Sequence, residues 1–247
     1  GVERSIETMH QRLGEPLTTD DLAHSAFMSR YHFIRVFSKV TGVSPGRFLA
    51  AIRMQEAKRL LLQTDRSVTD ICLDVGYSSH GTFTRIFNDF VGFSPIHFRQ
   101  RSLMLLGFTL KDVAQLFPTN RRCVGSVSIV GEITSEEPLA LVAVGMFATA
   151  IPRSHPIECV CLTDSRQFSF LTCPPSRSQI FAAGVTQTAT MEDAILMAPR
   201  NIQFGMAVPT PGTNGTLAVA LKPKPLFAPP VLLAFMPLIA ESLMQIK

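Results

Sequence analysis

The sequence predicts a multidomain protein, α then β: a double helix-turn-helix domain followed by an antiparallel β-sandwich or barrel with a C-terminal helix. Three observations lead to this prediction. A phrase in the first hundred residues occurs twice, the stretch between its copies has the periodicity of one long helix, and short β-rich runs separated by turn signals begin near Val124. The expected parts are residues 1–101, a helical linker over 102–123, and a β-rich domain over 124–247.

The repeated phrase reads "FIRVFSKVTGVSP" over 33–45 and "FTRIFNDFVGFSP" over 83–95. In each copy, two phenylalanines four residues apart share one face of a helix. A glycine then ends that helix, and a Ser-Pro pair begins the next one. When 29–48 is aligned with 79–98, the identical pairs are Ser29/Ser79, Phe33/Phe83, Arg35/Arg85, Phe37/Phe87, Gly42/Gly92, Ser44/Ser94, Pro45/Pro95 and Phe48/Phe98.

A short amphipathic run precedes each copy, "TTDDLAHSAF" and "SVTDICLDVGY". A short helix, a tight turn and a second helix make a helix-turn-helix, so the unit is predicted twice. Between the units, residues 45–63 predict a single helix of about 28 Å at 1.5 Å per residue. Successive major-groove faces of DNA lie about 34 Å apart. One rigid helix of this length can therefore hold two recognition helices roughly one turn of DNA apart.

Residues 1–101 resemble the DNA-binding domain of AraC/XylS-type bacterial transcription regulators. The resemblance rests on "DLAHSAFMSRYHFIRVFSKVTGVSP", "RMQEAKRLLLQTDRSVTDICLDVGYSS" and "FTRIFNDFVGFSPIHFR". It implies seven helices, two helix-turn-helix units that read adjacent major grooves of double-stranded DNA, a cytoplasmic activator of transcription, and RNA polymerase as a partner. Two features depart from the family pattern. The helix-turn-helix part comes first instead of last, and Gly81 lies in the second recognition helix, where it offers no side chain to a base.

The outer faces of the two predicted recognition helices are the candidate DNA-reading surfaces. Arginine suits guanine O6 and N7, and threonine or isoleucine can contact a thymine methyl group. By the resemblance, the base-contacting positions are Arg30, Tyr31, Ile34, Arg35, His80, Gly81, Thr84 and Arg85. The expected phosphate contacts, at or near helix starts, are Ser29, Arg47, Ser79, Thr82 and His97. The alternatives are a solvated or salt-bridged surface role for Arg35 and Arg85, and a partly buried Tyr31.

Charge is distributed unevenly along the chain. Residues 1–101 hold 13 basic and 10 acidic side chains, and the last 124 residues hold seven basic and eight acidic ones. This asymmetry fits a nucleic-acid module followed by a nearly neutral domain. The five cysteines do not suggest a disulfide framework and are expected to be buried and inert. No run of eighteen apolar residues predicts a membrane span.

In the second half, runs such as "LALVAVGMFA", "ECVCLTD" and "QIFAAGVTQ" predict about seven strands. Their rhythm resembles transthyretin-like sandwiches. Short helices are expected in "TLKDVAQLFP", capped at Thr109, and in "TMEDAILMAP". We expect no catalytic residues, metal site or cofactor here. Three roles stay open for the domain: binding a small-molecule effector, forming a homodimer through 124–247, or contacting RNA polymerase. The alternatives are a DNA-targeted modification or repair enzyme, and an assembly protein whose β-domain only dimerises.

Overall fold

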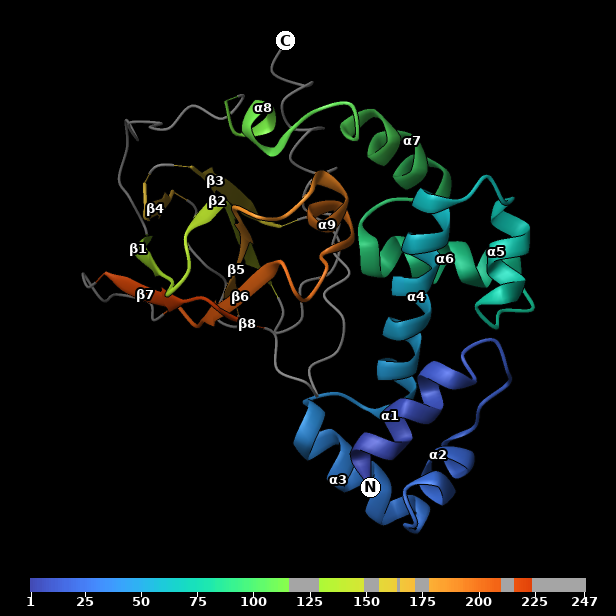
Figure 1. The fold of residues 1–247 in the computed structure, drawn as a ribbon. Helices are drawn as coiled ribbons and strands as arrows, with labels where there is room; N and C mark the ends of the chain where they lie inside the picture. The colour runs from blue at the N-terminus through green and yellow to red at the C-terminus, as the bar shows by residue number, and fades with distance from the viewer. Residues whose placement is uncertain (116–128, 149–155, 164, 172–177, 210–215, 224–247) are drawn as a thin grey trace. The chain divides into compact units, whose positions relative to one another are not determined.

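The computed structural model describes residues 1–115, 129–148, 156–163, 165–171, 178–209 and 216–223. These residues belong to two compact units that divide after Gln100, and each unit is considered by itself (Figure 1). In this described part of the chain, none of the helices is both long enough and apolar enough to cross a bilayer.

Residues 1–105 are all-α, with the predicted seven helices. They are α1 (Val2–Gln11), α2 (Thr19–Ser25), α3 (Arg30–Thr41), α4 (Pro45–Gln63), α5 (Val68–Asp74), α6 (His80–Val91) and α7 (Pro95–Leu105). The nineteen-residue connecting helix begins and ends where the sequence predicts. Figure 1 shows α4 running from the α1–α3 group to the α5–α7 group. Helix α7 passes the expected boundary at 101, so the three-part division remains a prediction.

The sequence repeat corresponds to a repeated aromatic core. In the first copy, the Phe33 and Phe37 ring centroids lie 5.3 Å apart, and Phe37 meets Phe48 edge-on at 5.4 Å. In the second, Phe83 and Phe87 lie 5.8 Å apart, and Phe87 meets Phe98 edge-on at the same distance. All six rings are buried. Each helix-turn-helix is thus packed onto the following helix by the same edge-to-face geometry.

Both recognition helices end at glycines in the left-handed region, as predicted. Gly42 has φ of 76° and Gly92 has φ of 90°, and their amides donate to the carbonyls of Ser38 and Asn88 at 3.0 Å. The N-caps are less uniform. Ser79 accepts a hydrogen bond from the Thr82 amide, whereas Ser29 occupies the N-cap position without a side-chain bond. The predicted side-chain cap is therefore made in the second copy only.

The second unit is mainly β. Its strands are β1 (Ile129–Thr134), β2 (Leu139–Phe147), β3 (Glu158–Leu162), β4 (Gln167–Phe170), β5 (Gln179–Thr186), β6 (Ile202–Ala207), β7 (Leu217–Ala220) and β8 (Lys222–Pro223). One sheet has the order β4-β1-β7 and the other β3-β2-β5-β6-β8. Adjacent strands pair antiparallel except β1 and β7, which pair in parallel from Gly131 with Leu217 to Thr134 with Ala220. The predicted antiparallel character holds, and the parallel pair is an addition.

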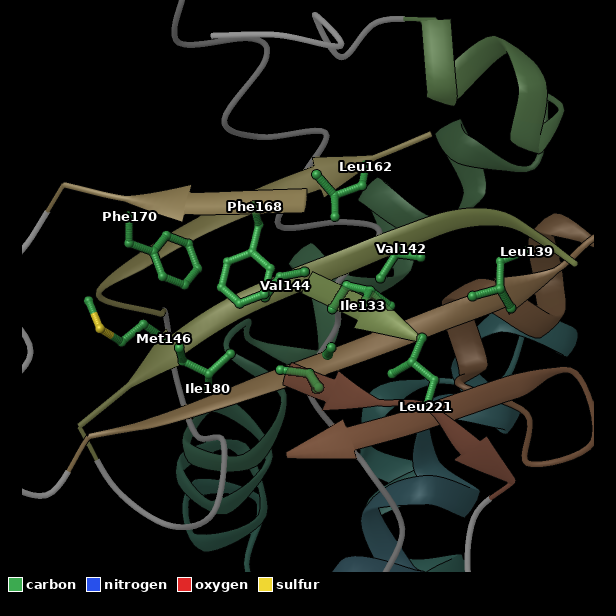
Figure 2. Packing of buried hydrophobic residues seen from close by; sticks show 12 residues of the cluster. Ile133, Leu139, Val142, Val144, Met146, Leu162, Phe168, Phe170, Ile180 and Leu221 are labelled. Carbon is green, nitrogen blue, oxygen red and sulfur yellow. The ribbon is translucent and has the colours of Figure 1, made fainter. Parts of the chain in front are cut away.

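The two sheets share one hydrophobic core (Figure 2). Val142, Val144 and Met146 alternate along β2 toward this core, and Phe168 and Phe170 face it from β4. Such alternation from two sheets is the packing of a sandwich. The expected helices in this half are present as α8 (Leu110–Gln115), whose Thr109 hydroxyl accepts from the Asp112 amide, and α9 (Met191–Leu196), capped by Thr190.

The cysteine prediction is partly wrong. Cys72 and Cys161 are buried, but Cys159 is exposed. Cys159 and Cys161 share the face of β3 that points away from the common core. Strand β3 is at the edge of its sheet, and Cys159 lies near the start of this strand. Cys123, Cys173 and the predicted C-terminal helix lie outside the described residues.

Candidate nucleic-acid interface

Helices α2 and α3 form one helix-turn-helix, and α5 and α6 form the second. In both turns, the residue after the C-cap of the first helix lies in the left-handed region: Phe27 at φ of 55° and Gly76 at φ of 81°. The following amides, of Met28 and Tyr77, donate to the carbonyls of Ala23 and Cys72 at 3.0 Å. This six-to-one bond closes each turn in the same way and sets the entry of each recognition helix. The predicted repeat of the unit is therefore also a repeat of its turn.

The outward face of α3 carries all four of its candidate base-contacting side chains. Arg30, Tyr31, Ile34 and Arg35 are exposed, and Tyr31 is 80% exposed, which excludes the partly buried alternative. The Arg30 guanidinium lies 3.2 Å from a carboxylate oxygen of Asp20 in α2. Both partners are solvent-accessible, so this pair contributes little to stability and leaves Arg30 able to move toward a ligand.

The outward face of α6 offers less. His80, Gly81 and Arg85 are exposed, but Thr84 is half-buried. The Thr84 hydroxyl oxygen is buried and has no hydrogen-bond partner, so it is turned away from solvent. A Cβ atom added at Gly81 would meet nothing within 4 Å. At this position α6 therefore has open space where α3 has the Tyr31 side chain.

The candidate phosphate contacts lie mostly at helix starts. Ser29, Ser79, Thr82 and His97 are exposed, and the His97 amide in the first turn of α7 lies 3.4 Å from the Ser94 hydroxyl. Arg47, in the first turn of α4, is half-buried, and its Nε is buried without a hydrogen-bond partner. The positions suit backbone recognition, with Arg47 the least accessible of them.

Sequence reasoning missed Lys39. It is exposed and lies four residues after Arg35, so both point from the same side of α3. The spacing from Arg35 was a signal that could have identified it. With Lys39 included, α3 carries three cationic side chains and no acidic one.

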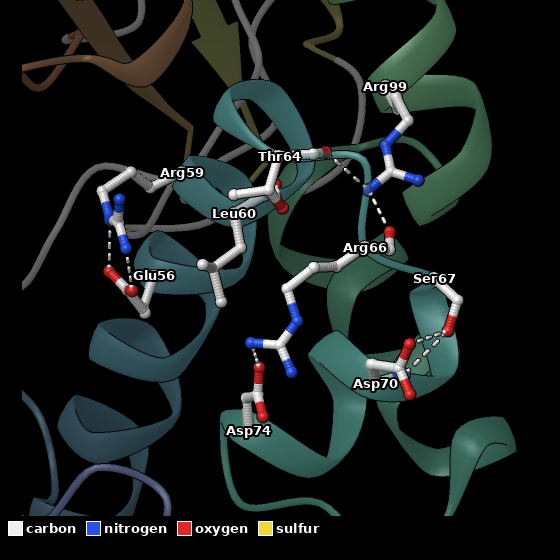
Figure 3. Close-up of polar contacts among 9 residues, drawn as sticks. All are labelled: Glu56, Arg59, Leu60, Thr64, Arg66, Ser67, Asp70, Asp74 and Arg99. Carbon is white, nitrogen blue, oxygen red and sulfur yellow. Dashed lines mark hydrogen bonds and ion pairs between the residues drawn. The ribbon is translucent and has the colours of Figure 1, made fainter.

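Two arginines fix the helix-turn-helix units onto α4. Arg53 of α4 donates to the carbonyls of Leu13 and Glu15, at 3.0 and 2.6 Å, in the loop before α2. Arg99 of α7 donates to the carbonyl of Leu61 at 2.9 Å. It also donates to the carbonyls of Arg66 at 2.6 Å and Thr64 at 3.4 Å (Figure 3). Charged donors on carbonyls form strong hydrogen bonds. The loop before α2 is thereby held to the middle of α4, and α7 to its C-terminal end, by side-chain bonds in addition to the apolar core.

A neighbouring set of contacts stabilises α5 and the turn before it. The Arg66 guanidinium forms an ion pair with Asp74, and the Ser67 hydroxyl accepts from the Asp70 amide at 3.1 Å (Figure 3). Arg66 precedes α5 and Asp74 ends it, so the pair spans the helix from one end to the other. These bonds join the residues just before α5, the first helix of the second unit, to both ends of that helix.

Lys58 of α4 is the one described lysine that is fully buried. Its ammonium nitrogen lies 5.7 Å from the centre of the Phe98 ring and has no hydrogen-bond partner. Burial lowers the pKa of Lys58 to about 7. This side chain faces the core of the helical unit and takes no part in the outer DNA-reading faces.

Among the described residues, no group of three or more histidine, cysteine, aspartate or glutamate side chains could hold a metal ion.

Comparison with known proteins finds relatives for the helical unit. A family model described as a helix-turn-helix domain matches residues 22–101. An uncharacterised HTH-type transcriptional regulator of Haemophilus influenzae is 44% identical over 81 residues, covering 33% of this chain and 27% of the relative. The bifunctional transcriptional activator/DNA repair enzyme AdaA of Bacillus subtilis is 32% identical over 103 residues, covering 42% and 49%. The chain thus spans about a quarter to a half of these two relatives.

A solved AraC-type DNA-binding-domain-containing regulator from Chromobacterium violaceum is similar over 40% of this chain and 89% of its own, with 29% identity and a TM-score of 0.39. The probable transcription factor PqrA of Proteus vulgaris is 35% identical over 99 residues, which cover 40% of this chain and 80% of PqrA. Together with the paired helix-turn-helix units, this match establishes that the chain belongs to the AraC/XylS-type family of transcription regulators.

Proposed function

We propose that this protein is a sequence-specific transcription regulator that binds double-stranded DNA with α3 and α6 in adjacent major grooves. One observation carries the proposal: Arg35 and Arg85 are exposed at the same register of two matched recognition helices, and one continuous helix joins the two units. Arginine at such a position can form two hydrogen bonds with guanine. The names of its relatives as transcriptional regulators agree with this function.

The exposed serines and threonine at the helix starts, with His97, would fix the register on the DNA backbone. Backbone contacts of this kind position a protein without reading sequence. Base preference would then come from the side chains in the middle of α3 and α6. On this account the protein acts where the bacterial chromosome lies, in the cytoplasm, and recruits or contacts RNA polymerase there.

The β unit is proposed to bind a small effector. The support is an open hollow of about 1070 Å³ within this unit. Cavities that bind small molecules are concave, apolar over much of their lining, and carry a few polar groups. This lining combines apolar and polar side chains: Leu106, Phe108, Thr109, Leu110, Lys111, Gln115, Ala140, Thr163, Gln187, Ala189, Thr190, Met191 and Glu192. Self-association through residues 124–247 is the other regulatory route proposed for this unit.

The alternative of a DNA repair or modification enzyme draws support from the name of one relative, AdaA. Within the described β residues, the thiols available as nucleophiles are Cys159 and Cys161. Burial raises the pKa of the Cys161 thiol, and partial desolvation together with the neighbouring Glu158 carboxylate raises the pKa of the surface thiol of Cys159, so both are protonated at neutral pH. A protonated thiol is a poor nucleophile. The regulator without enzymatic activity is therefore the function we propose.

The test is selection by the full chain from a pool of randomised duplex DNA, followed by titration of the selected duplex and of a shuffled one. Arg35→Ala and Arg85→Ala should each weaken binding to the selected duplex by about 1–3 kcal/mol and relax one base preference. Arg59→Ala, an exposed arginine of α4 paired with Glu56, is the control and should bind like the parent. Equal affinity of the parent for selected and shuffled DNA would contradict the proposed function.

A further inference from the structure

The two recognition helices differ in what they present, although their scaffolds match. Four candidate base-contacting side chains of α3 reach solvent: Arg30, Tyr31, Ile34 and Arg35. On α6, Gly81 has no side chain and the Thr84 hydroxyl is buried. His80 and Arg85 remain as the exposed polar groups among the four expected positions of that helix.

The charges of the two helices differ in the same direction. Helix α3 contains Arg30, Arg35 and Lys39 and no acidic residue, so its arginine and lysine side chains give it a formal charge of +3. Helix α6 contains Arg85 and Asp89, one of each sign. Phosphate contacts come from lysine and arginine and release counterions. The first unit therefore has more side chains for both parts of DNA recognition, base edges and backbone.

From this difference we infer that the protein reads its DNA site asymmetrically. The half-site bound by α3 specifies sequence. The half-site bound by α6 tolerates many sequences and is held mainly through contacts with the DNA backbone and one contact from Arg85. The inference rests on the proposed function, because it divides the same DNA contact between two helices. The partner is thus a duplex of about two helical turns with one informative half and one tolerant half.

Gly81 gives the inference a gain-of-function test. Gly81 is exposed and an added Cβ there meets nothing within 4 Å, so a side chain can start at this position without displacing a neighbour. Glutamine pairs with adenine N6 and N7 through two hydrogen bonds. Gly81→Gln should therefore add a base preference in the tolerant half. Gly81→Ala adds the methyl group and the helix propensity but no polar group, so a preference in Gly81→Gln beyond that in Gly81→Ala comes from the amide.

The experiment uses the full chain and a duplex library with about 25 randomised base pairs, wide enough for two turns. The enriched half-sites are assigned to helices by repeating the selection with Arg35→Ala and with Arg85→Ala. Scrambling the α3 half-site should reduce affinity at least tenfold more than scrambling the α6 half-site. Gly81→Gln should add a preference of about fivefold or more at one base pair of the tolerant half, the low end for a two-bond base contact.

Equal losses for the two scrambled halves, or a larger loss for the α6 half, would overturn the asymmetry and leave sequence-specific binding intact. A Gly81→Gln variant that gains no preference over Gly81→Ala would show that α6 does not approach base edges at that position, and would overturn the stated route to the tolerant half. No enrichment of any sequence by the parent chain would instead overturn the proposed function, and with it this inference.

Discussion

Lys58 lies in α4 with its side chain enclosed by the helical core. Its ammonium nitrogen has no hydrogen-bond partner and lies 5.7 Å from the centre of the Phe98 ring. A buried cation without a partner costs free energy, and lysine responds by a lowered pKa. The sequence "RMQEAKRLLLQ" gave no reason to single out this lysine from its exposed neighbour Arg59, because burial at one helical position depends on what another helix brings to it.

We expect Lys58→Met to raise the free energy of unfolding at pH 7 by about 2 kcal/mol or more. The reason is that methionine has similar length and no ammonium group to desolvate, and each unit of pKa shift corresponds to about 1.4 kcal/mol. Chemical denaturation measures the change. Arg59→Met, at the neighbouring exposed position, should change stability by less than about 1 kcal/mol. A destabilised Lys58→Met protein would show that the amine has a stabilising partner.

The pH dependence follows with a definite sign. The pKa of Lys58 is about 7 in the folded protein, against its ordinary value of 10.5 when unfolded. Between these pH values the unfolded chain binds a proton that the folded chain does not, so the free energy of unfolding increases as pH rises from about 7 to about 10.5. The difference between the parent and Lys58→Met should therefore shrink across this window. A difference that stays constant with pH would contradict the lowered pKa.

Gly42 and Gly46 offer a matched pair for the effect of backbone conformation. Gly42 has φ of 76°, whereas Gly46 lies in the first turn of α4, and an added Cβ meets nothing within 4 Å at either position. Left-handed backbone costs other residues about 1–2 kcal/mol. Gly42→Ala should lower the melting temperature, and Gly46→Ala should leave it unchanged or raise it. Equal shifts in thermal unfolding would mean that the turn after α3 relaxes freely.

At the scale of elements, the local pattern predicted what local interactions determine. The bounds of α4, the glycines that end α3 and α6, and the buried phenylalanines all follow from helix periodicity and end signals. The contacts of Arg53 and Arg99 could not be predicted, because each guanidinium reaches carbonyls more than thirty residues away. The burial of the Thr84 hydroxyl could not be predicted either, because the sequence of one helix does not show which neighbouring elements cover the edge of its outer face.

Helix α4 is expected to act as a rigid spacer. Glu56→Pro places proline in the interior of α4, where it removes a helical hydrogen bond and costs about 3 kcal/mol or more. Affinity for a full two-groove site should fall toward that of one unit. Glu56→Ala removes the same ion pair with Arg59 while preserving the helix, and should bind like the parent.

Helical content measured by circular dichroism would distinguish a local kink in Glu56→Pro from general unfolding. A folded Glu56→Pro protein that protects the same length of DNA with the same affinity would show that a continuous α4 is not required for the two units to bind together.

At the scale of the whole molecule, the order of an α part and a β part could be predicted because composition and periodicity change near Val124. The pairing of strands could not. Strand β1 pairs in parallel with β7, more than eighty residues later, and with β4 on its other side. A strand's alternation shows which of its side chains face a core but not which strand lies beside it. The likeness to transthyretin-like sandwiches remains a prediction.

The central claim is that one rigid helix holds two recognition helices on adjacent major grooves of one DNA face. The most direct test measures the affinity of the full chain for its selected duplex and for versions with 5 or 10 base pairs inserted between the half-sites. A 5-base-pair insertion turns one groove to the opposite face of the DNA. A 10-base-pair insertion adds about 34 Å to half-sites that already lie about one turn apart, and the resulting separation of about 68 Å is beyond two units joined by a helix of roughly 28 Å. We predict that both insertions reduce affinity to that of the α3 half-site alone. Full affinity after the 10-base-pair insertion would contradict the account, because it would require the two units to separate.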